Sequence, residues 1–142
     1  MPRLTGNLSV KYMLDTNICI SLIRQQSPTL IQRLISYTPG EICVSSITVA
    51  ELAHGVQKSN QQQKNMAALE QFLLPLEIAD FDQRASIAYG VVRATLEREG
   101  NIIGTMDMLI GAHALSLDTT LVTNNIKEFQ RIPDLKLEDW MK

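Results

Sequence analysis

Apolar residues in this chain fall into short continuous runs that alternate with longer segments of helical spacing. Short apolar runs bounded by polar or turn-forming residues are typical of buried strands. We predict four such strands and a fifth, shorter one near the C-terminus. They lie at 10–14, 41–45, 76–79, 120–123 and 135–137.

Between these runs, apolar residues recur at intervals of three and four, which indicates helices that bury one face. The first predicted helix follows Asp15, and the second begins at Ser27-Pro28 and ends before Pro39-Gly40. Further helices are predicted at 48–59, 67–74, 82–99 and 107–117. Strands that alternate with helices predict an α/β fold, with a mostly parallel central sheet of 4–5 strands flanked by helices.

No composition break marks a linker in the 142 residues, so we expect a single domain over 10–142. Residues 1–9 are predicted to be a flexible N-terminal leader. No apolar run approaches the roughly 18 residues that a membrane span requires, and the N-terminus lacks the pattern of a signal peptide. We therefore expect a soluble, cytoplasmic protein.

The charge balance does not identify a nucleic-acid binder, because 13 Lys and Arg stand against 15 Asp and Glu. An enzyme can still act on RNA with a local basic surface and a bound metal ion, since the ion supplies positive charge where the phosphate sits. Cys19 and Cys43 lie in apolar runs without CxxC spacing or nearby histidines. We interpret both as buried thiols rather than as disulfide or metal partners.

Three acidic residues, Asp15, Glu51 and Asp107, stand near the starts of predicted helices. Each has a local explanation. Asp15 could cap the helix after it, Glu51 could form a capping box with Thr48, and Asp107 could stabilise the positive end of a helix dipole. For each residue taken alone, this local alternative stays open.

In combination, the three carboxylates indicate a metal site. Helices that follow parallel strands begin at one edge of the sheet, so three independent caps would crowd into one pocket and repel one another. Clustered carboxylate oxygens suit Mg²⁺ or Mn²⁺, and the absence of paired Cys and His argues against zinc. Such an ion activates water or stabilises a leaving oxygen, which suits attack on a phosphodiester.

Four segments resemble, in order, the motifs of the VapC toxins, which are PIN-domain endoribonucleases of type II toxin–antitoxin pairs. The segments read MLDTNI at 13–18, SSITVAELAHG at 45–55, IGTMDMLIGAHA at 103–114 and LVTNNIKEF at 121–129. The resemblance covers about residues 10–141 and includes the ending Glu138-Asp139-Trp140. It implies a PIN-like fold.

The resemblance also implies roles for particular residues. The family's first three acidic positions fall on Asp15, Glu51 and Asp107, which are expected to ligate Mg²⁺ or Mn²⁺. Where many PIN domains have a fourth acidic residue, this chain offers Asn124 and Asn125, and we expect Asn125 to be catalytic. The expected contacts to substrate are Thr16, Asn17, Asn124, Lys127 and Arg131, although Lys127 and Arg131 could equally form a solvated face.

The likeness is greatest to the VapC branch that cuts initiator tRNA in the anticodon stem-loop, which implies that substrate. It further implies a VapB-type antitoxin whose C-terminal segment covers the acidic pocket, and a toxin homodimer within the complex. A PIN scaffold that only binds RNA or antitoxin is the alternative. A phosphatase of the haloacid dehalogenase type is disfavoured, because its second Asp would fall on Asn17, and the acidic and Lys arrangement of a receiver domain is missing.

Three further residues have a functional and a structural interpretation. His54 could act as an acid or base, but a metal mechanism requires no imidazole, so we expect a structural or supporting role. His113 lies within an apolar helix pattern and is expected to be a hydrogen-bonded core histidine. Trp140 could stack on a base, yet we expect it to anchor the C-terminus.

Overall fold

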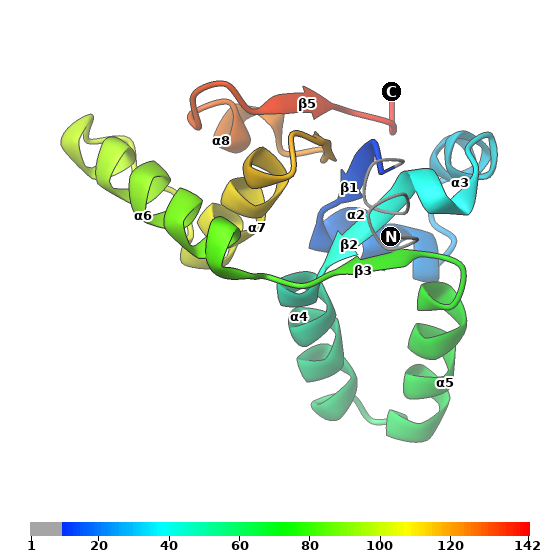
Figure 1. Ribbon diagram of the computed structural model, residues 1–142. Helices are drawn as coiled ribbons and strands as arrows, with labels where there is room; N and C mark the ends of the chain where they lie inside the picture. The colour runs from blue at the N-terminus through cyan, green and yellow to red at the C-terminus, as the bar shows by residue number, and fades with distance from the viewer. Residues whose placement is uncertain (1–9) are drawn as a thin grey trace, which may run out of the picture.

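The central sheet has five strands and is parallel throughout (Figure 1). A computed structural model describes residues 10–142, and the predicted leader at 1–9 lies outside the described residues. The sheet order is β3-β2-β1-β4-β5, and every neighbouring pair is parallel, as predicted. The strands are β1 (Tyr12–Leu14), β2 (Ile42–Ser45), β3 (Glu77–Ala79), β4 (Thr120–Val122) and β5 (Lys136–Glu138).

Helices cover both faces of this sheet. Figure 1 shows α4 and α5 extending from one side as a hairpin, whereas α6 and α7 lie together on the other. The helices are α2 (Thr16–Ile23), α3 (Pro28–Ile35), α4 (Ser46–Gln57), α5 (Gln62–Leu73), α6 (Gln83–Arg98), α7 (Thr105–Ser116) and α8 (Ile126–Phe129), with a 3-10 turn η1 (Pro39–Glu41) before β2. No helix among the described residues is long and apolar enough to cross a membrane.

Three helices begin earlier than the sequence pattern predicts, and α7 does so by two residues, at Thr105 rather than Asp107. Helix α4 starts at Ser46 rather than Thr48, because the Ser45 hydroxyl accepts the Ile47 N–H at 3.0 Å and so caps the helix. Helix α5 starts at Gln62 rather than Ala67. The glutamines of this stretch have good helix propensity, which apolar periodicity does not register.

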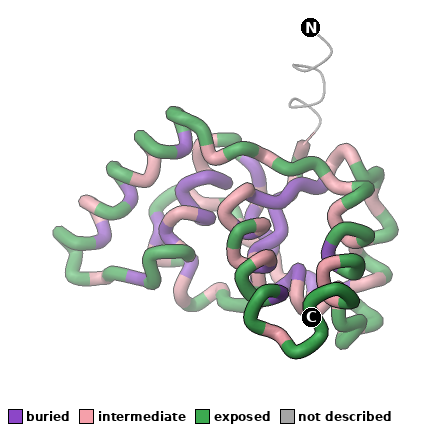
Figure 2. Tube along the Cα trace, turned by 90° about the horizontal axis from the view of Figure 1, so that it is seen from below, coloured by how far each residue is buried: buried purple, intermediate pink, exposed green. Residues whose placement is uncertain are grey.

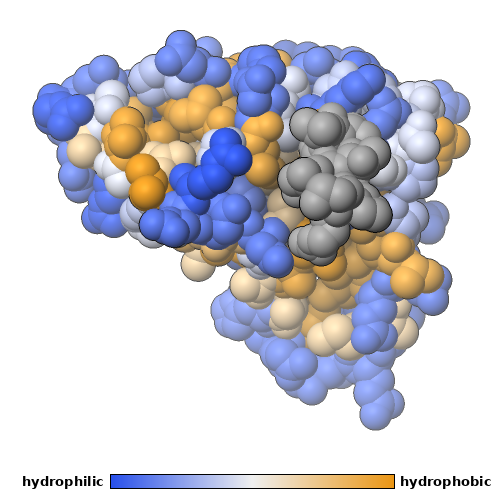
Figure 3. Space-filling model, in the orientation of Figure 1, coloured by the Kyte–Doolittle hydropathy of each residue, from blue (hydrophilic) through white to orange (hydrophobic). Residues whose placement is uncertain are grey.

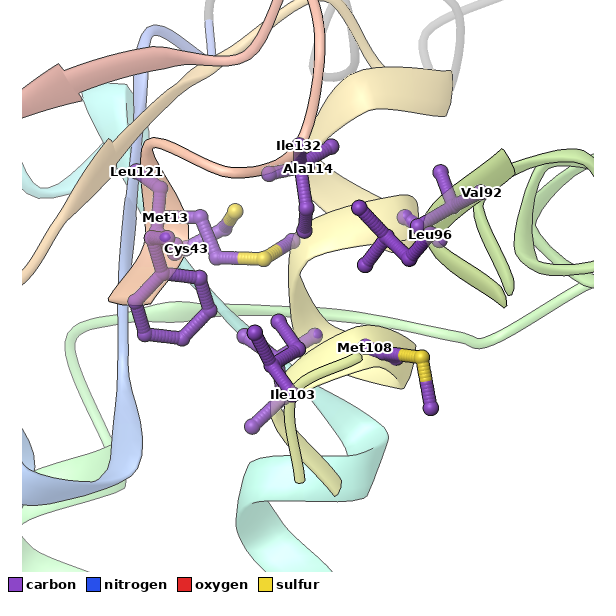
Figure 4. Close-up of a cluster of buried hydrophobic side chains, with 12 residues drawn as sticks. Met13, Cys43, Val92, Leu96, Ile103, Met108, Ala114, Leu121 and Ile132 are labelled. Carbon is purple, nitrogen blue, oxygen red and sulfur yellow. The ribbon is translucent and has the colours of Figure 1, made fainter. Parts of the chain in front are cut away.

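The strands bury alternate side chains on opposite faces. Met13, Cys43 and Leu121 pack with residues of α6, α7 and α8 in the cluster that Figure 4 shows. Leu14 and Val122 face the other way, toward α2 to α5. Because both faces of the strands are buried, a shift of one residue in register would turn each of these side chains toward the wrong helix layer. Full burial of one such side chain contributes about 1.5–3 kcal/mol. Figure 2 shows the buried segments gathered inside a rim of exposed helix surface.

The two cysteines and Trp140 have the structural roles expected of them. Cys19 and Cys43 are free and buried. Trp140 is only 1% exposed. Its ring stacks on Tyr37 with centroids 5.1 Å apart, and its indole Nε1–H donates to Glu138 Oε1 at 2.9 Å. Trp140 therefore anchors the C-terminus and is too buried to stack on a base.

The order in which the chain adds strands to the sheet reverses at the boundary between β1 and β4. It adds β2 and β3 on one side of β1, then crosses to β4 and β5 on the other. The Asp15 N–H donates to the Val122 carbonyl at 3.0 Å, so the carboxyl ends of β1 and β4 are joined where the loops diverge. Such switch points are where open α/β sheets bind their ligands.

Candidate active site

Asp15 begins the site at the end of β1. Its carboxylate accepts the Ile18 N–H at 2.8 Å, which caps α2, and also accepts the hydroxyl of Thr123. The side chain is 4% exposed. Burial raises the pKa of Asp15, the two hydrogen bonds oppose the rise, and the nearby Glu51 carboxylate adds to it. Asp15 therefore does cap α2, as the local alternative proposed. Its carboxylate is also buried near that of Glu51.

Glu51 reaches the same region from α4. Its Oε1 accepts the hydroxyl of Thr16 at 2.6 Å, a contact between the first turn of α2 and the middle of α4. The capping-box alternative for Glu51 is wrong, because the cap of α4 is Ser45 and Thr48 lies buried inside the helix. The Thr48 hydroxyl instead lies 3.3 Å from that of Thr16. Thr16 thus supports Glu51 directly.

Asp107 lies in the first turn of α7 and meets a carboxylate that sequence analysis missed. The pKa of Asp107 is raised to about 7, first by burial and then by a hydrogen bond with the Glu128 carboxyl group. The negative charges of Glu128, Asp15 and Glu51 raise it further. Glu128 is therefore close enough to Asp107 to influence its protonation.

Glu128 corrects the expectation that this chain lacks a fourth acidic residue. Asn124 and Asn125 carry no charge, but the short helix α8 places Glu128 one turn beyond Asn125. The Asn125 side chain donates to Glu128 Oε1 at 3.4 Å, and its backbone N–H donates to the Thr123 hydroxyl at 2.9 Å. The sequence signal that could have identified Glu128 was the NNxxE spacing. In this spacing the acidic residue lies one helical turn after the second asparagine and can point back toward the end of the strand.

The donor set of this site suits a hard divalent cation. In the described part of the chain, no Lys or Arg forms an ion pair with Asp15, Glu51, Asp107 or Glu128. Among residues 10–142, no three carboxylate, thiolate or imidazole groups lie close enough together to hold a metal ion as they stand. Carboxylate oxygens are nonetheless the hard donors that Mg²⁺ prefers, and Mg²⁺ keeps several waters and takes few protein ligands.

The remaining predicted contacts lie outside this carboxylate cluster. Asn17, Asn124 and Lys127 are exposed. Arg131 is partly buried, and its guanidinium donates to the Ile102 carbonyl at 3.1 Å, which ties it to the loop before α7. His54 is exposed on α4.

A groove of about 230 Å³ runs between α2, α4 and α5 and has Glu51 among its lining residues. Most of the lining is apolar, and Arg24 and Asn65 add polar groups. The groove therefore offers an apolar path along three helices that leads to one carboxylate of the cluster. Its apolar lining residues include Ile20, Ile23, Leu52, Val56 and Leu69.

Comparison with known families agrees with this geometry. The profile described as PIN domain matches residues 12–135. "Ribonuclease VapC2" of Rickettsia felis is 47% identical over 132 residues, which is 92% of this chain and 98% of the relative. The chain belongs to the VapC group of the PIN-domain family. A second VapC relative, "tRNA(fMet)-specific endonuclease VapC" of Salmonella typhimurium, is 42% identical over 131 residues, with 92% and 98% covered.

Solved structures of VapC proteins have the same fold. The chain matches a VapBC2 structure from Rickettsia felis bound to a promoter DNA fragment, with TM-score 0.87 and 45% identity over 92% of this chain and 99% of the other. It matches DNA-bound VapBC from Salmonella typhimurium with TM-score 0.88 and 41% identity over 92% and 98%. The predicted PIN fold is thus confirmed.

Proposed function

We propose that this chain is the toxin of a type II toxin–antitoxin pair and a metal-dependent endoribonuclease. One observation carries the proposal: the carboxylates of Asp15, Glu51 and Glu128 are close enough to Asp107 to raise its pKa, and none of the four has a basic partner among the described residues. Such a cluster is costly unless a cation neutralises it. The ribonuclease names of the relatives support the same conclusion.

Each residue around the cluster has a distinct role in this proposal. Asp15, Glu51 and Asp107 would hold Mg²⁺ or Mn²⁺, with Glu128 in place of the fourth acidic ligand. The ion would supply an activated water and stabilise the leaving oxygen. Thr16 fixes Glu51 through its 2.6 Å hydrogen bond. Asn125 orients Glu128, and the N-terminal N–H groups of α2 and α7 face the phosphate.

The proposed substrate is initiator tRNA, cut in the anticodon stem-loop. The support is the name of the Salmonella relative and of another from Shigella flexneri, "tRNA(fMet)-specific endonuclease VapC", the latter at 39% identity. Asn17, Asn124 and Lys127 are exposed and can contact phosphates beside the cluster. Mapping the cuts in total tRNA tests this assignment, and cleavage confined to another RNA would refute it.

The proposed partner is a VapB-type antitoxin, and the toxin is proposed to act in the cytoplasm. The solved structures that this chain matches are VapBC complexes. The apolar groove along α2, α4 and α5 suits an amphipathic segment of that partner, because its lining is mostly apolar and includes Glu51. A segment seated there would cover the acidic cluster and block the approach of RNA.

The activity is tested by incubating the purified chain with total tRNA in Mg²⁺ and in excess EDTA. Asp15→Asn and Asp107→Ala remove one proposed ligand each, and Glu97→Gln removes a carboxylate from an exposed ion pair on α6 as a control. We expect cleavage by wild type and Glu97→Gln only with Mg²⁺. Each ligand variant should lose at least the roughly 10–100-fold that a supporting residue is worth at metal sites.

Other outcomes have definite meanings. Equal cleavage by all variants, or cleavage that persists in EDTA, would point to a contaminant and contradict the proposed site. Absence of cleavage by a folded wild type in Mg²⁺ and Mn²⁺ would favour the scaffold that acts only by binding RNA or antitoxin.

A further inference from the structure

His113 makes a buried side-chain contact that the proposed reaction does not use. Its Nδ1 lies 2.8 Å from the Ser45 hydroxyl oxygen, and both residues are fully enclosed, at 1% and 0% exposed. Ser45 ends β2 and caps α4, whereas His113 lies in α7. The contact therefore joins two helices at a sequence separation of 68 residues.

The hydrogen bonds of Ser45 indicate whether the proton between Ser45 Oγ and His113 Nδ1 belongs to the hydroxyl or to the ring. The Ser45 oxygen already accepts the Ile47 N–H at 3.0 Å, so its own proton is free to be donated to His113 Nδ1. Burial lowers the pKa of His113, which keeps the imidazole neutral at pH 7. In this arrangement Nε2 carries the ring hydrogen.

The other side of the ring lacks a matching partner. His113 Nε2 has no hydrogen bond of good geometry among the described residues. The backbone of Asp80 and the carboxylates of Asp80 and Asp82 lie on this side, close enough to favour the protonated ring, and Phe81 packs edge-on at 5.2 Å. An unpaired buried polar group destabilises the fold. An apolar side chain would avoid that cost but could not form the directional bond to Ser45.

The helices joined by this bond carry two of the four clustered carboxylates. Glu51 follows Ser45 on α4, and Asp107 precedes His113 on α7, each by less than two helical turns. A hydrogen bond so close to both carboxylates constrains how α4 and α7 lie relative to each other. An apolar contact at the same place would allow the helices to slide.

We propose that His113 is a positioning residue that holds α4 against α7 through Ser45 and thereby sets the separation of the Glu51 and Asp107 carboxylates. Its effect on metal binding and cleavage rests on the proposed function, whereas its effect on the geometry of the helices does not. Displacement of a reacting group by about 1 Å can lower a rate on the order of 100-fold, so small shifts in this separation matter.

The test uses three variants of the full chain. His113→Leu and Ser45→Ala both break the bond, whereas His113→Asn keeps an acceptor near the position of Nδ1. His54→Leu, at an exposed histidine of α4, is the matched control. The readouts are Mn²⁺ affinity by electron paramagnetic resonance, kcat and KM for tRNA cleavage, and the thermal midpoint.

We expect His113→Leu and Ser45→Ala to weaken Mn²⁺ binding and lower kcat by about 10-fold or more, with KM little changed. These losses should persist at temperatures where each variant is fully folded, and His113→Asn should restore most of both. A purely structural role would lower only the thermal midpoint. Wild-type Mn²⁺ affinity and kcat in folded His113→Leu would overturn the proposal.

A second measurement decides the inference even if the proposed function fails. The ¹⁵N shifts of the His113 ring should show a neutral imidazole with hydrogen on Nε2 at pH 7. The backbone amide shifts of Glu51 and Asp107 should change in His113→Leu and Ser45→Ala and return in His113→Asn. A ring protonated on Nδ1, or unchanged amide shifts in the broken variants, would refute the positioning role. Failure of wild type to bind Mn²⁺ or cleave RNA would refute the proposed function alone.

Discussion

Asp107 is a carboxylate whose pKa the fold raises into the neutral range. It is partly buried and hydrogen-bonded to Glu128, with the charges of Asp15 and Glu51 nearby. These surroundings disfavour its ionised form, which raises its pKa to about 7. A cation bound between the carboxylates would reverse this effect, because it favours the ionised form. Proton and metal therefore compete for Asp107.

This competition predicts how stability depends on pH without metal. The pKa of Asp107 rises from 3.8 to about 7 on folding, so the folded state binds the proton more tightly. Its stabilising contribution is complete below pH 3.8 and is lost as pH rises through about 7. Urea unfolding in EDTA should thus show that the free energy of unfolding falls as pH rises from 3.8 to about 7. This fall should be smaller in Asp107→Asn than in wild type. An equal fall in both proteins would contradict the assignment. Mn²⁺ affinity should rise over the same range.

Glu128 supplies a second prediction at this scale. Glu128→Gln removes a negative charge beside Asp107, so the pKa of Asp107 should fall and Mn²⁺ binding should weaken by about 10-fold or more. Calorimetric titration with Mn²⁺ measures the affinity, and Glu97→Gln on the exposed face of α6 is the control. If Glu128→Gln binds Mn²⁺ as wild type does, Glu128 is not part of the site.

At the scale of elements, the sequence predicts most strands and helices and the capped starts of α2, α3 and α6, but not the capped start of α4. The start of α4 depends on the Ser45 hydroxyl, which apolar spacing does not detect. Asp15, Glu51 and Asp107 were predicted because each stands near the start of a helix that follows a strand or loop. Glu128 was missed because α8, with only 4 residues, is too short to leave a periodic pattern. Its contact with Asp107 depends on tertiary packing.

Two helical glycines give a matched prediction about packing. A Cβ at Gly111 of α7 would lie 2.5 Å from Ile132 Cδ1, within the buried core. Gly111→Ala should therefore destabilise the fold by about 1–3 kcal/mol. A Cβ at Gly90 of α6 meets nothing within 4 Å. Gly90→Ala should stabilise the protomer by about 0.5–1 kcal/mol, because glycine weakens a helix interior. Urea unfolding measures both, and equal stability of the two variants would contradict the packing described for α7.

At the scale of the whole molecule, the described residues form apolar surfaces that include a groove and a face of α6. One is the groove along α2, α4 and α5 that we assign to the antitoxin. The other lies on α6, where Ile87 and Val91 are 62% and 63% exposed on either side of Gly90. Figure 3 shows hydrophobic residues on the part of the surface that α6 forms. We assign this second surface to the proposed toxin homodimer, because two α6 helices could approach closely at Gly90.

The two assignments predict opposite effects of two charge substitutions. Val91→Asp on α6 should shift the free toxin toward monomer by light scattering, with antitoxin binding retained. Ile23→Asp in the groove should abolish co-purification with the antitoxin and leave the oligomeric state of the free toxin unchanged. Unchanged mass in Val91→Asp, or a stable complex in Ile23→Asp, would contradict the corresponding assignment.

The central claim is that four carboxylates at the switch point of the sheet bind the metal ion of a ribonuclease. A crystal structure of the protein grown with Mn²⁺, with anomalous differences recorded, tests it most directly. The account predicts an anomalous peak within coordination distance of Asp15 and Asp107, with Glu51 and Glu128 contacting it directly or through water, and no such peak in Asp107→Asn. No anomalous peak at the four carboxylates, or Mn²⁺ held only elsewhere, would contradict it.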